Sequence, residues 1–164
     1  MSELALLGGK AAVSGSFARF NTIGEEERDR VSPLLSGLSP LSGFLGGVLR
    51  GGEHVKQLEE NWAKRFKVRH AVACNSATSG LLAASFAVGV CIGDEVITTP
   101  YTFIATTEAM CKVRAKSVFV DIDAGTYNID VRQIEKKINK RTKALIPVHL
   151  YGQSCDMEPI LELA

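Results

Sequence analysis

The chain has 164 residues, of which 46% are hydrophobic, and its 19 basic and 18 acidic residues give a formal net charge of +1. This composition predicts a globular protein with a hydrophobic core and excludes a disordered chain. The even charge balance removes the electrostatic argument for a nucleic-acid partner or an anionic membrane. The apolar runs are too short for a transmembrane segment and the first residues lack the basic start of a signal peptide, so we expect a cytoplasmic protein without a membrane partner.

Cysteine and histidine usage argues against disulfides and metal sites. The cysteines are widely spaced without a C-x-x-C pair, and most lie in apolar segments: Cys74, Cys91, Cys111 and Cys155. This pattern predicts reduced thiols in the core. The histidines show no metal-ligand spacing with one another or with cysteine, so no metal site is predicted.

Residues 1–52 are predicted to form a Gly-rich arm with one short helix. Ten of the fifteen glycines fall in this stretch and interrupt any regular period. Thr22 and Glu25 have the spacing of a capping box, which predicts a helix from about Ile23, and Pro33 is expected to kink or end it. Such an arm either packs against another subunit or wraps over its own domain, and the sequence leaves both open.

Residues 53–164 are predicted to form the main domain, which begins with an amphipathic helix. Val55, Leu58, Trp62 and Phe66 recur at helical spacing with charged residues between them. An aromatic residue in such a stripe is more often core than ligand-binding, so we expect Trp62 to be buried.

Beyond Val68, strand-like and helical runs alternate. Strands are predicted at 71–74, 96–99, 117–121 and 144–148, and helices at 79–90, 104–113, 131–140 and from about Met157. Asp130 and Gln133 have capping-box spacing, and Asp156 can cap the last helix. This alternation predicts right-handed crossovers and a mostly parallel sheet covered by helices, which is an α/β fold.

An α/β sheet binds its ligands beyond the carboxyl ends of its strands. At the first of these ends, residues 75–78 form a small hydroxyl-rich turn that precedes a helix. Its backbone N–H groups can bind a phosphate, with Ser76, Thr78 and Ser79 as further donors, or Asn75 or Thr78 simply caps the helix. Neither a P-loop nor a G-x-G-x-x-G motif is present, which argues against a P-loop ATPase and a Rossmann dehydrogenase.

The residues at the other strand ends each have two possible interpretations. Phe103, like Tyr101, either lies flat on a planar ring or packs in a core or interface. Asp121 and Asp123 are explained by turn chemistry better than by an acid–base pair. His149 either faces a cofactor or is a satisfied structural histidine.

Several motifs in register resemble the DegT/DnrJ/StrS-type sugar aminotransferases over about residues 46–164. They are Asn75-Ser-Ala-Thr-Ser-Gly-Leu81, Gly93-Asp-Glu-Val-Ile97, Pro100-Tyr-Thr-Phe103, Arg141-Thr-Lys-Ala144 and Val148-His-Leu-Tyr-Gly-Gln153. The resemblance implies the three-layer, mostly parallel sheet of the large domain of fold type I enzymes, here incomplete. It also implies the cofactor pyridoxal 5'-phosphate (PLP) and a homodimer. The implied reaction moves an amino group from glutamate or glutamine to a keto sugar or keto-cyclitol, in amino-sugar, cell-surface polysaccharide or secondary-metabolite biosynthesis.

The resemblance also assigns cofactor-binding residues. Ser76, Ala77 and Thr78 match the turn that holds the cofactor phosphate, Phe103 matches the aromatic that stacks on the pyridine ring, and His149 would lie near the cofactor. No catalytic residue is assigned, because the Schiff-base lysine and the aspartate that pairs with the pyridinium are expected beyond Ala164.

We therefore expect the N-terminal part of a longer aminotransferase. The alternatives are a PLP-dependent sugar dehydratase of the same family, in which histidine replaces the lysine, and a truncated, non-catalytic binding or assembly module. A generic α/β nucleotide-binding domain also stays open.

Overall fold

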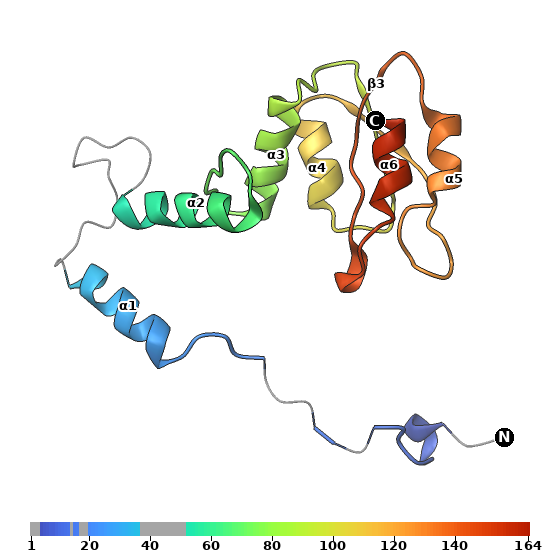
Figure 1. The fold of residues 1–164 in the computed structure, drawn as a ribbon. Coiled ribbons are helices and arrows are strands. Elements are labelled where there is room, and N and C mark those ends of the chain that lie inside the picture. Colours follow the sequence, from blue (N-terminus) through green and yellow to red (C-terminus); the bar gives the residue numbers. More distant parts are fainter. Residues whose placement is uncertain (1–3, 14, 17–19, 37–51) are drawn as a thin grey trace. The chain divides into compact units, whose positions relative to one another are not determined.

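The computed structural model describes residues 4–13, 15–16, 20–36 and 52–164 (Figure 1). It comprises two compact units, Met1–Ala71 and Val72–Ala164. The domain boundary expected after residue 52 stays a prediction, because residues 37–51 lie outside the described ranges. None of the helices within those ranges combines the length and the apolar character that a membrane crossing requires.

The first unit contains only helical elements in its described part. They are the 3₁₀ turn η1 (Ala5–Leu7) and the helices α1 (Glu25–Leu35) and α2 (Glu53–Phe66). The N-cap of α1 is Gly24, whose N–H donates to Oε2 of Glu27 at 2.7 Å. The capping box expected at Thr22 is therefore wrong by two residues, and the bond from Gly24 lowers the pKa of Glu27. Pro33 lies within the last turn, and α1 ends two residues after it.

Helix α2 spans the predicted residues, but its apolar stripe is exposed. Leu58, Trp62 and Phe66 are 53%, 54% and 53% exposed, and the rings of Trp62 and Phe66 lie 4.8 Å apart. The prediction that Trp62 is a core residue is wrong in this chain. An amphipathic stripe is buried only where a second element covers it, and within the described residues the indole packs on Phe66 instead.

The second unit is built on a parallel sheet with the strand order β2-β1-β3. The strands are β1 (Glu95–Thr98), β2 (Lys116–Phe119) and β3 (Thr142–Leu145). The helical elements are α3 (Ala77–Ala87), α4 (Ala105–Lys112), α5 (Val131–Ile134), the 3₁₀ turns η2 (Glu135–Lys137) and η3 (Leu150–Gly152), and α6 (Met157–Leu163). Every residue of the central strand β1 is buried, as expected for a strand with a neighbour on each side.

Most predicted elements of this unit are confirmed, with two corrections. The stretch predicted as a strand at 71–74 has no regular secondary structure, and Val72 is 80% exposed. The helix predicted to reach Lys140 is shorter, because α5 passes into η2 and the backbone becomes extended at Ile138.

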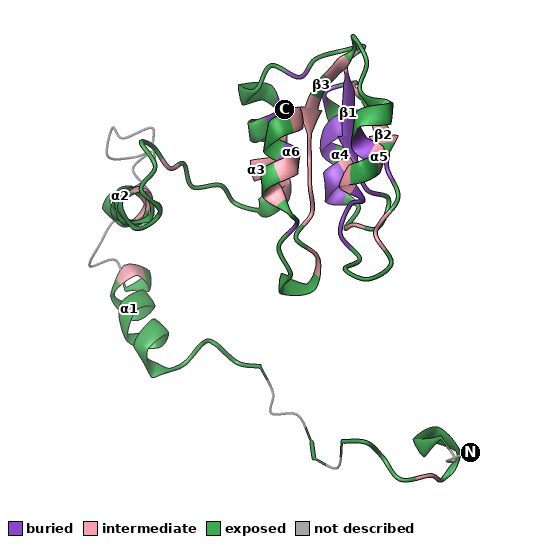
Figure 2. Cartoon of the chain, turned by 45° about the vertical axis from the view of Figure 1, so that its right-hand side comes forward, coloured by how far each residue is buried: buried purple, intermediate pink, exposed green. Residues whose placement is uncertain are grey.

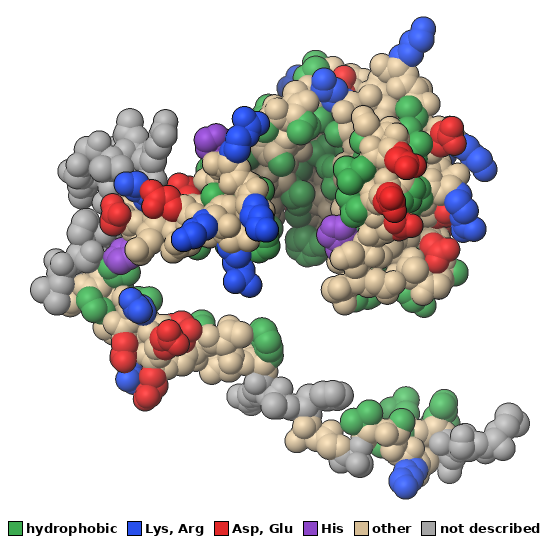
Figure 3. Space-filling view, viewed as in Figure 1, with side chains coloured by type: hydrophobic (Ala, Val, Ile, Leu, Met, Phe, Trp, Pro, Cys, Tyr) green, Lys and Arg blue, Asp and Glu red, His purple; other side chains and the backbone are tan. Residues whose placement is uncertain are grey.

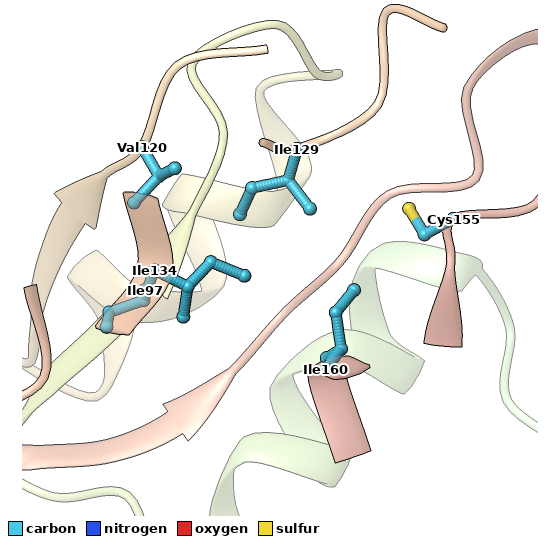
Figure 4. Packing of buried hydrophobic residues seen from close by; sticks show 6 residues of the cluster. All are labelled: Ile97, Val120, Ile129, Ile134, Cys155 and Ile160. Carbon is cyan, nitrogen blue, oxygen red and sulfur yellow. The ribbon is translucent and has the colours of Figure 1, made fainter. Parts of the chain in front are cut away.

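Hydrophobic side chains form a core on each face of the sheet. Val96 packs with residues of α4 on one face, and Ile97 packs with residues of α5 and α6 on the other. The second cluster consists of Ile97, Val120, Ile129, Ile134, Cys155 and Ile160 (Figure 4). The buried residues gather in β1 and α4 (Figure 2). Helices therefore cover both faces, which confirms the expected three-layer α/β fold.

The cysteines differ from the expected core thiols. All four are free, but only Cys155 is buried, so the prediction is wrong for Cys74, Cys91 and Cys111. Cys91 lies in the polar turn between α3 and β1, where its Sγ donates to Oδ2 of Asp94 at 3.3 Å. This hydrogen bond raises the pKa of the Cys91 thiol.

A buried carboxylate closes the amino edge of the sheet. Glu95, at the start of β1, accepts hydrogen bonds at 2.7 Å from both Arg141 Nη2 and Asn139 Nδ2. Lys116 Nζ lies 3.6 Å from the same carboxylate. The bond from Asn139 and the two cations lower the pKa of Glu95. The motifs at 93–97 and 141–144 therefore meet in a structural contact that joins the three strand starts.

Candidate functional site

The segments in which the sequence predicts a ligand site follow the strands at the carboxyl edge of the sheet. β1, β2 and β3 are parallel, so their following segments leave from the same edge (Figure 1). Helix α3 leads into β1 after a short connection and packs against α4, which places the start of α3 on that side. Residues from distant parts of the sequence are thereby available to one ligand.

The start of α3 has a serine cap and two backbone donors to spare. Ser76 is the N-cap, and its Oγ accepts a hydrogen bond from the N–H of Ser79 at 3.1 Å. Its carbonyl accepts from the N–H of Gly80 at 3.0 Å. The cap is thus neither Asn75 nor Thr78. The N–H groups of Ala77 and Thr78 have no acceptor within the described ranges, so the cap at Ser76 leaves these two donors available.

The connection from β1 to α4 is pinned by threonines and presents an aromatic ring. Thr98 Oγ1 donates to the carbonyl of Ile146 at 2.8 Å, and Thr99 Oγ1 accepts from the N–H of Tyr101 at 3.2 Å. Both threonines are buried, whereas Phe103 is 75% exposed. Phe103 is therefore not a core residue of this unit, which leaves ring stacking or an interface as its role.

Three tyrosines meet at the same edge. The hydroxyls of Tyr101 and Tyr151 lie 3.0 Å apart, and the ring of Tyr127 lies 6.2 Å from that of Tyr101. The hydrogen bond to Tyr151 raises the pKa of Tyr101. The sequence leaves the role of Tyr101 open and gives no signal for Tyr127. No spacing signal links these residues, because they come from three different connections.

His149 lies in the connection from β3 to α6 and has a defined ring orientation. Its Nδ1 accepts a hydrogen bond from the N–H of Cys155 at 3.0 Å. The neutral ring therefore carries its proton on Nε2, where it can donate to a ligand. His149 is exposed, so it is held by the protein and accessible at the same time.

Asp121 and Asp123 both accept hydrogen bonds from nearby backbone N–H groups. Oδ1 of Asp123 accepts from the N–H groups of Gly125 and Thr126 at 3.0 and 3.1 Å, and Oδ1 of Asp121 accepts from the N–H of Ile122 at 2.8 Å. This geometry confirms the turn interpretation for Asp123. In Figure 3, side chains of both charge signs lie over α5 and α6, so that visible face has no single-sign field.

These features define a parallel α/β domain with a serine-capped helix start and an exposed aromatic ring among its connections. Residues 43–164 match the DegT/DnrJ/EryC1/StrS aminotransferase family. The chain belongs to this family.

Two curated relatives show what kinds of protein it resembles. The chain is 43% identical over 142 residues to the spore coat polysaccharide biosynthesis protein SpsC of Bacillus subtilis, covering 87% of this chain and 34% of the relative. It is 37% identical over 163 residues to a putative L-glutamine:3-amino-2,3-dideoxy-scyllo-inosose aminotransferase of Streptoalloteichus tenebrarius, covering 99% and 38%. The chain thus spans little more than a third of the length of these relatives.

Solved structures agree with the fold. An aminotransferase from Psychrobacter cryohalolentis matches with a TM-score of 0.80 and 32% identity over 91% of this chain and 36% of that one. The PLP form of a putative sugar aminotransferase from Streptococcus pneumoniae matches with a TM-score of 0.76 and 31% identity, covering 86% and 34%. A GDP-4-keto-6-deoxymannose-3-dehydratase with a trapped PLP-glutamate geminal diamine matches with a TM-score of 0.76 and 25% identity, covering 88% and 36%.

Proposed function

We propose that this chain is the N-terminal part of the large domain of a PLP-dependent aminotransferase. The enzyme moves an amino group from glutamate or glutamine to a keto sugar or keto-cyclitol, in the cytoplasm. Family membership and the relatives support this proposal. The observation that carries it is the pair of backbone donors at Ala77 and Thr78 beside the Ser76 cap, at the edge where α/β enzymes bind ligands.

The described residues offer the kinds of groups that a pyridoxal phosphate needs. The phosphate would be held by the N–H groups of Ala77 and Thr78 and by the positive end of α3, which runs for eleven residues. The exposed ring of Phe103 would cover the pyridine ring and exclude water from it. His149 would donate from Nε2 to a polar group of the cofactor or substrate.

When bound, PLP supplies the electron sink for amino transfer, and the protein supplies binding and orientation. A lysine and a carboxylate for the pyridinium nitrogen are also needed. Lys116 and Lys143 lie in β2 and β3, and Lys116 contacts Glu95 at the opposite edge of the sheet. Following the family resemblance, we assign this lysine and this carboxylate to residues outside 1–164.

The decisive experiment examines the natively expressed full-length protein by visible absorption and by intact mass before and after borohydride reduction. We expect a PLP absorption band and, after reduction, a mass that shows a PLP adduct fixed to a lysine. A protein that binds PLP but is not reduced onto lysine would instead be the family's dehydratase, the second candidate, which the similarity to the sugar dehydratase supports. A protein without any cofactor band would overturn both.

The proposal includes a homodimer with the Gly-rich arm at its interface. Part of that arm lies outside the described residues, and the exposed stripe of α2 follows it. We predict that deleting residues 1–45 weakens self-association in sedimentation velocity. An unchanged sedimentation profile would argue that the arm covers its own domain.

A further inference from the structure

The turn that follows His149 adopts an unfavourable backbone conformation. Tyr151 and Gly152 have φ values of 51° and 84°, in the left-handed region. A tyrosine avoids this region because its Cβ crowds the backbone, so the surroundings must hold it there. The turn is a short 3₁₀ element, and the N–H of Gln153 donates to the carbonyl of Leu150 at 2.9 Å.

A buried asparagine from another connection clamps this turn. Asn128 is 5% exposed, and its Oδ1 accepts from the N–H of Leu150 at 3.1 Å. Its Nδ2 donates to the carbonyls of Gln153 and Ser154 at 3.2 and 3.1 Å. One side chain thus replaces three backbone partners along the turn, and both amide protons are engaged.

Asn128 is itself fixed to the sheet side of the molecule. Its carbonyl accepts from the N–H of Asp123 at 2.8 Å, and its N–H donates to Oγ1 of Thr126 at 3.3 Å. Ile122 and Ile129 beside it form an antiparallel bridge, and Ile129 belongs to the hydrophobic core. Asn128 is therefore held by the core side of the unit, whereas the turn that it binds is exposed.

The end of the turn at Ser154 and Cys155 fixes the orientation of the His149 ring. Ser154, held by Asn128, precedes Cys155, whose N–H donates to Nδ1 of His149. The Cys155 thiol is buried and donates to the carbonyl of Val148 at 3.1 Å. Displacement of Ser154 would move the donor that orients His149.

We infer that Asn128 is a positioning residue that holds the 149–155 turn, so that Nε2–H of His149 and the hydroxyl of Tyr151 face the ligand edge. It touches no reacting atom itself. Its effect on the reaction rests on the proposed function, but its effect on His149 does not.

The test compares the full-length protein with two variants, using 15N-labelled histidine. Asn128→Asp keeps the size of the side chain and the acceptor for Leu150, but removes both Nδ2 donors. Gly152→Ala disturbs the turn through its φ alone, because a Cβ there meets no atom within 4 Å. His149→Gln assigns the His149 signals by their loss.

The measured quantity is the tautomer of His149, at a pH about two units above the ordinary imidazole pKa of about 6.5. We expect the parent to show only the tautomer with the proton on Nε2. In both variants, the 15N chemical shifts of the two ring nitrogens should move toward each other, because the two tautomers interconvert. Asn21→Asp is the matched control: its Oδ1 still accepts from the N–H of Ile23, so it should resemble the parent. Parent-like His149 signals in folded Asn128→Asp and Gly152→Ala would overturn the inference. If Asn128→Asp does not fold, parent-like His149 signals in folded Gly152→Ala still overturn the inference, because the turn would then not set the tautomer of His149.

If Asn128 only stabilised the fold, Asn128→Asp would lower Tm and leave the tautomer of His149 in the folded protein unchanged. For the proposed amino transfer, we expect kcat/KM of Asn128→Asp to fall about 10- to 100-fold, as for groups that orient a functional histidine. If the parent transfers no amino group, the proposed function fails, while the tautomer measurement still decides the role of Asn128.

Discussion

The two edges of the sheet treat their polar groups in opposite ways. At the amino edge, Glu95 is buried and its carboxylate binds Arg141, Asn139 and Lys116. At the carboxyl edge, the N–H groups of Ala77 and Thr78 have no acceptor among the described residues, and the Phe103 ring is exposed. Polar groups that satisfy one another stabilise a fold, whereas groups left open beside an exposed ring are available to a ligand.

The difference separates two kinds of family motif. The segments at 93–97 and 141–144 meet around Glu95 and serve the fold. The segments at 100–103 and 148–153 meet where the hydroxyls of Tyr101 and Tyr151 lie 3.0 Å apart, and the segment at 75–81 begins α3. We assign these three segments to the proposed cofactor site. Mutations at the two edges should therefore change different observables.

The largest effect is expected from β1, which both edges share. Ile97 is fully buried in the core cluster, so Ile97→Ala should lower the free energy of unfolding by about 2–5 kcal/mol. Stability and cofactor affinity should both decline, as measured by denaturant unfolding and PLP titration of the full-length protein. A loss below about 0.5 kcal/mol would mean that this core is not formed as described.

A smaller effect, confined to stability, is expected at the amino edge. Because the pKa of Glu95 is lowered from its ordinary value of 4.5, the unfolded state binds more protons than the folded state at acidic pH. The carboxylate thus contributes stability above pH 4.5, and the contribution is lost as the pH falls through the lowered pKa. Glu95→Gln should lower Tm by several degrees at neutral pH, flatten the acid dependence of Tm and leave PLP affinity unchanged. Weakened PLP binding in a folded Glu95→Gln would contradict the separation of the edges.

The smallest effect is expected from the exposed ring. Phe103→Ala should weaken PLP binding about three- to tenfold, the range for an aromatic stacking contact, with little change in Tm. Phe86→Ala removes a 61% exposed phenylalanine from the last part of α3 and provides the matched control. Equal PLP affinity of the two variants would remove Phe103 from the site.

Sequence patterns predicted the layers well, because the layers depend on local periodicity. Val96 and Ile97 pack on opposite faces as alternation requires, and strand ends locate the edge by topology alone. The failures have non-local causes. Whether 71–74 forms a strand depends on a neighbour, and the burial of Trp62 depends on a covering element.

The details of the site escaped sequence analysis for the same reason. Asn128 binds the turn at 150–154 across more than twenty residues, and Tyr101 meets Tyr151 across fifty. Neither pairing leaves a spacing signal. The cap at Ser76 was missed because Asn75 and Thr78 are equally good capping residues, and only the backbone conformation distinguishes them.

The most direct test of the account removes one backbone donor from the carboxyl edge. Ala77 is the first residue of α3, where proline is tolerated, and Ser76 before it is extended with φ −161° and ψ 158°, which suits a residue that precedes proline. Glu53→Pro makes the same change at the first residue of α2, after the extended Gly52. In PLP titrations of the full-length protein, we predict that Ala77→Pro weakens binding about 10- to 100-fold, as expected for one lost hydrogen bond to a charged group, while Glu53→Pro binds like the parent. Parent-like affinity in a folded Ala77→Pro would contradict the assignment of this turn to the cofactor phosphate.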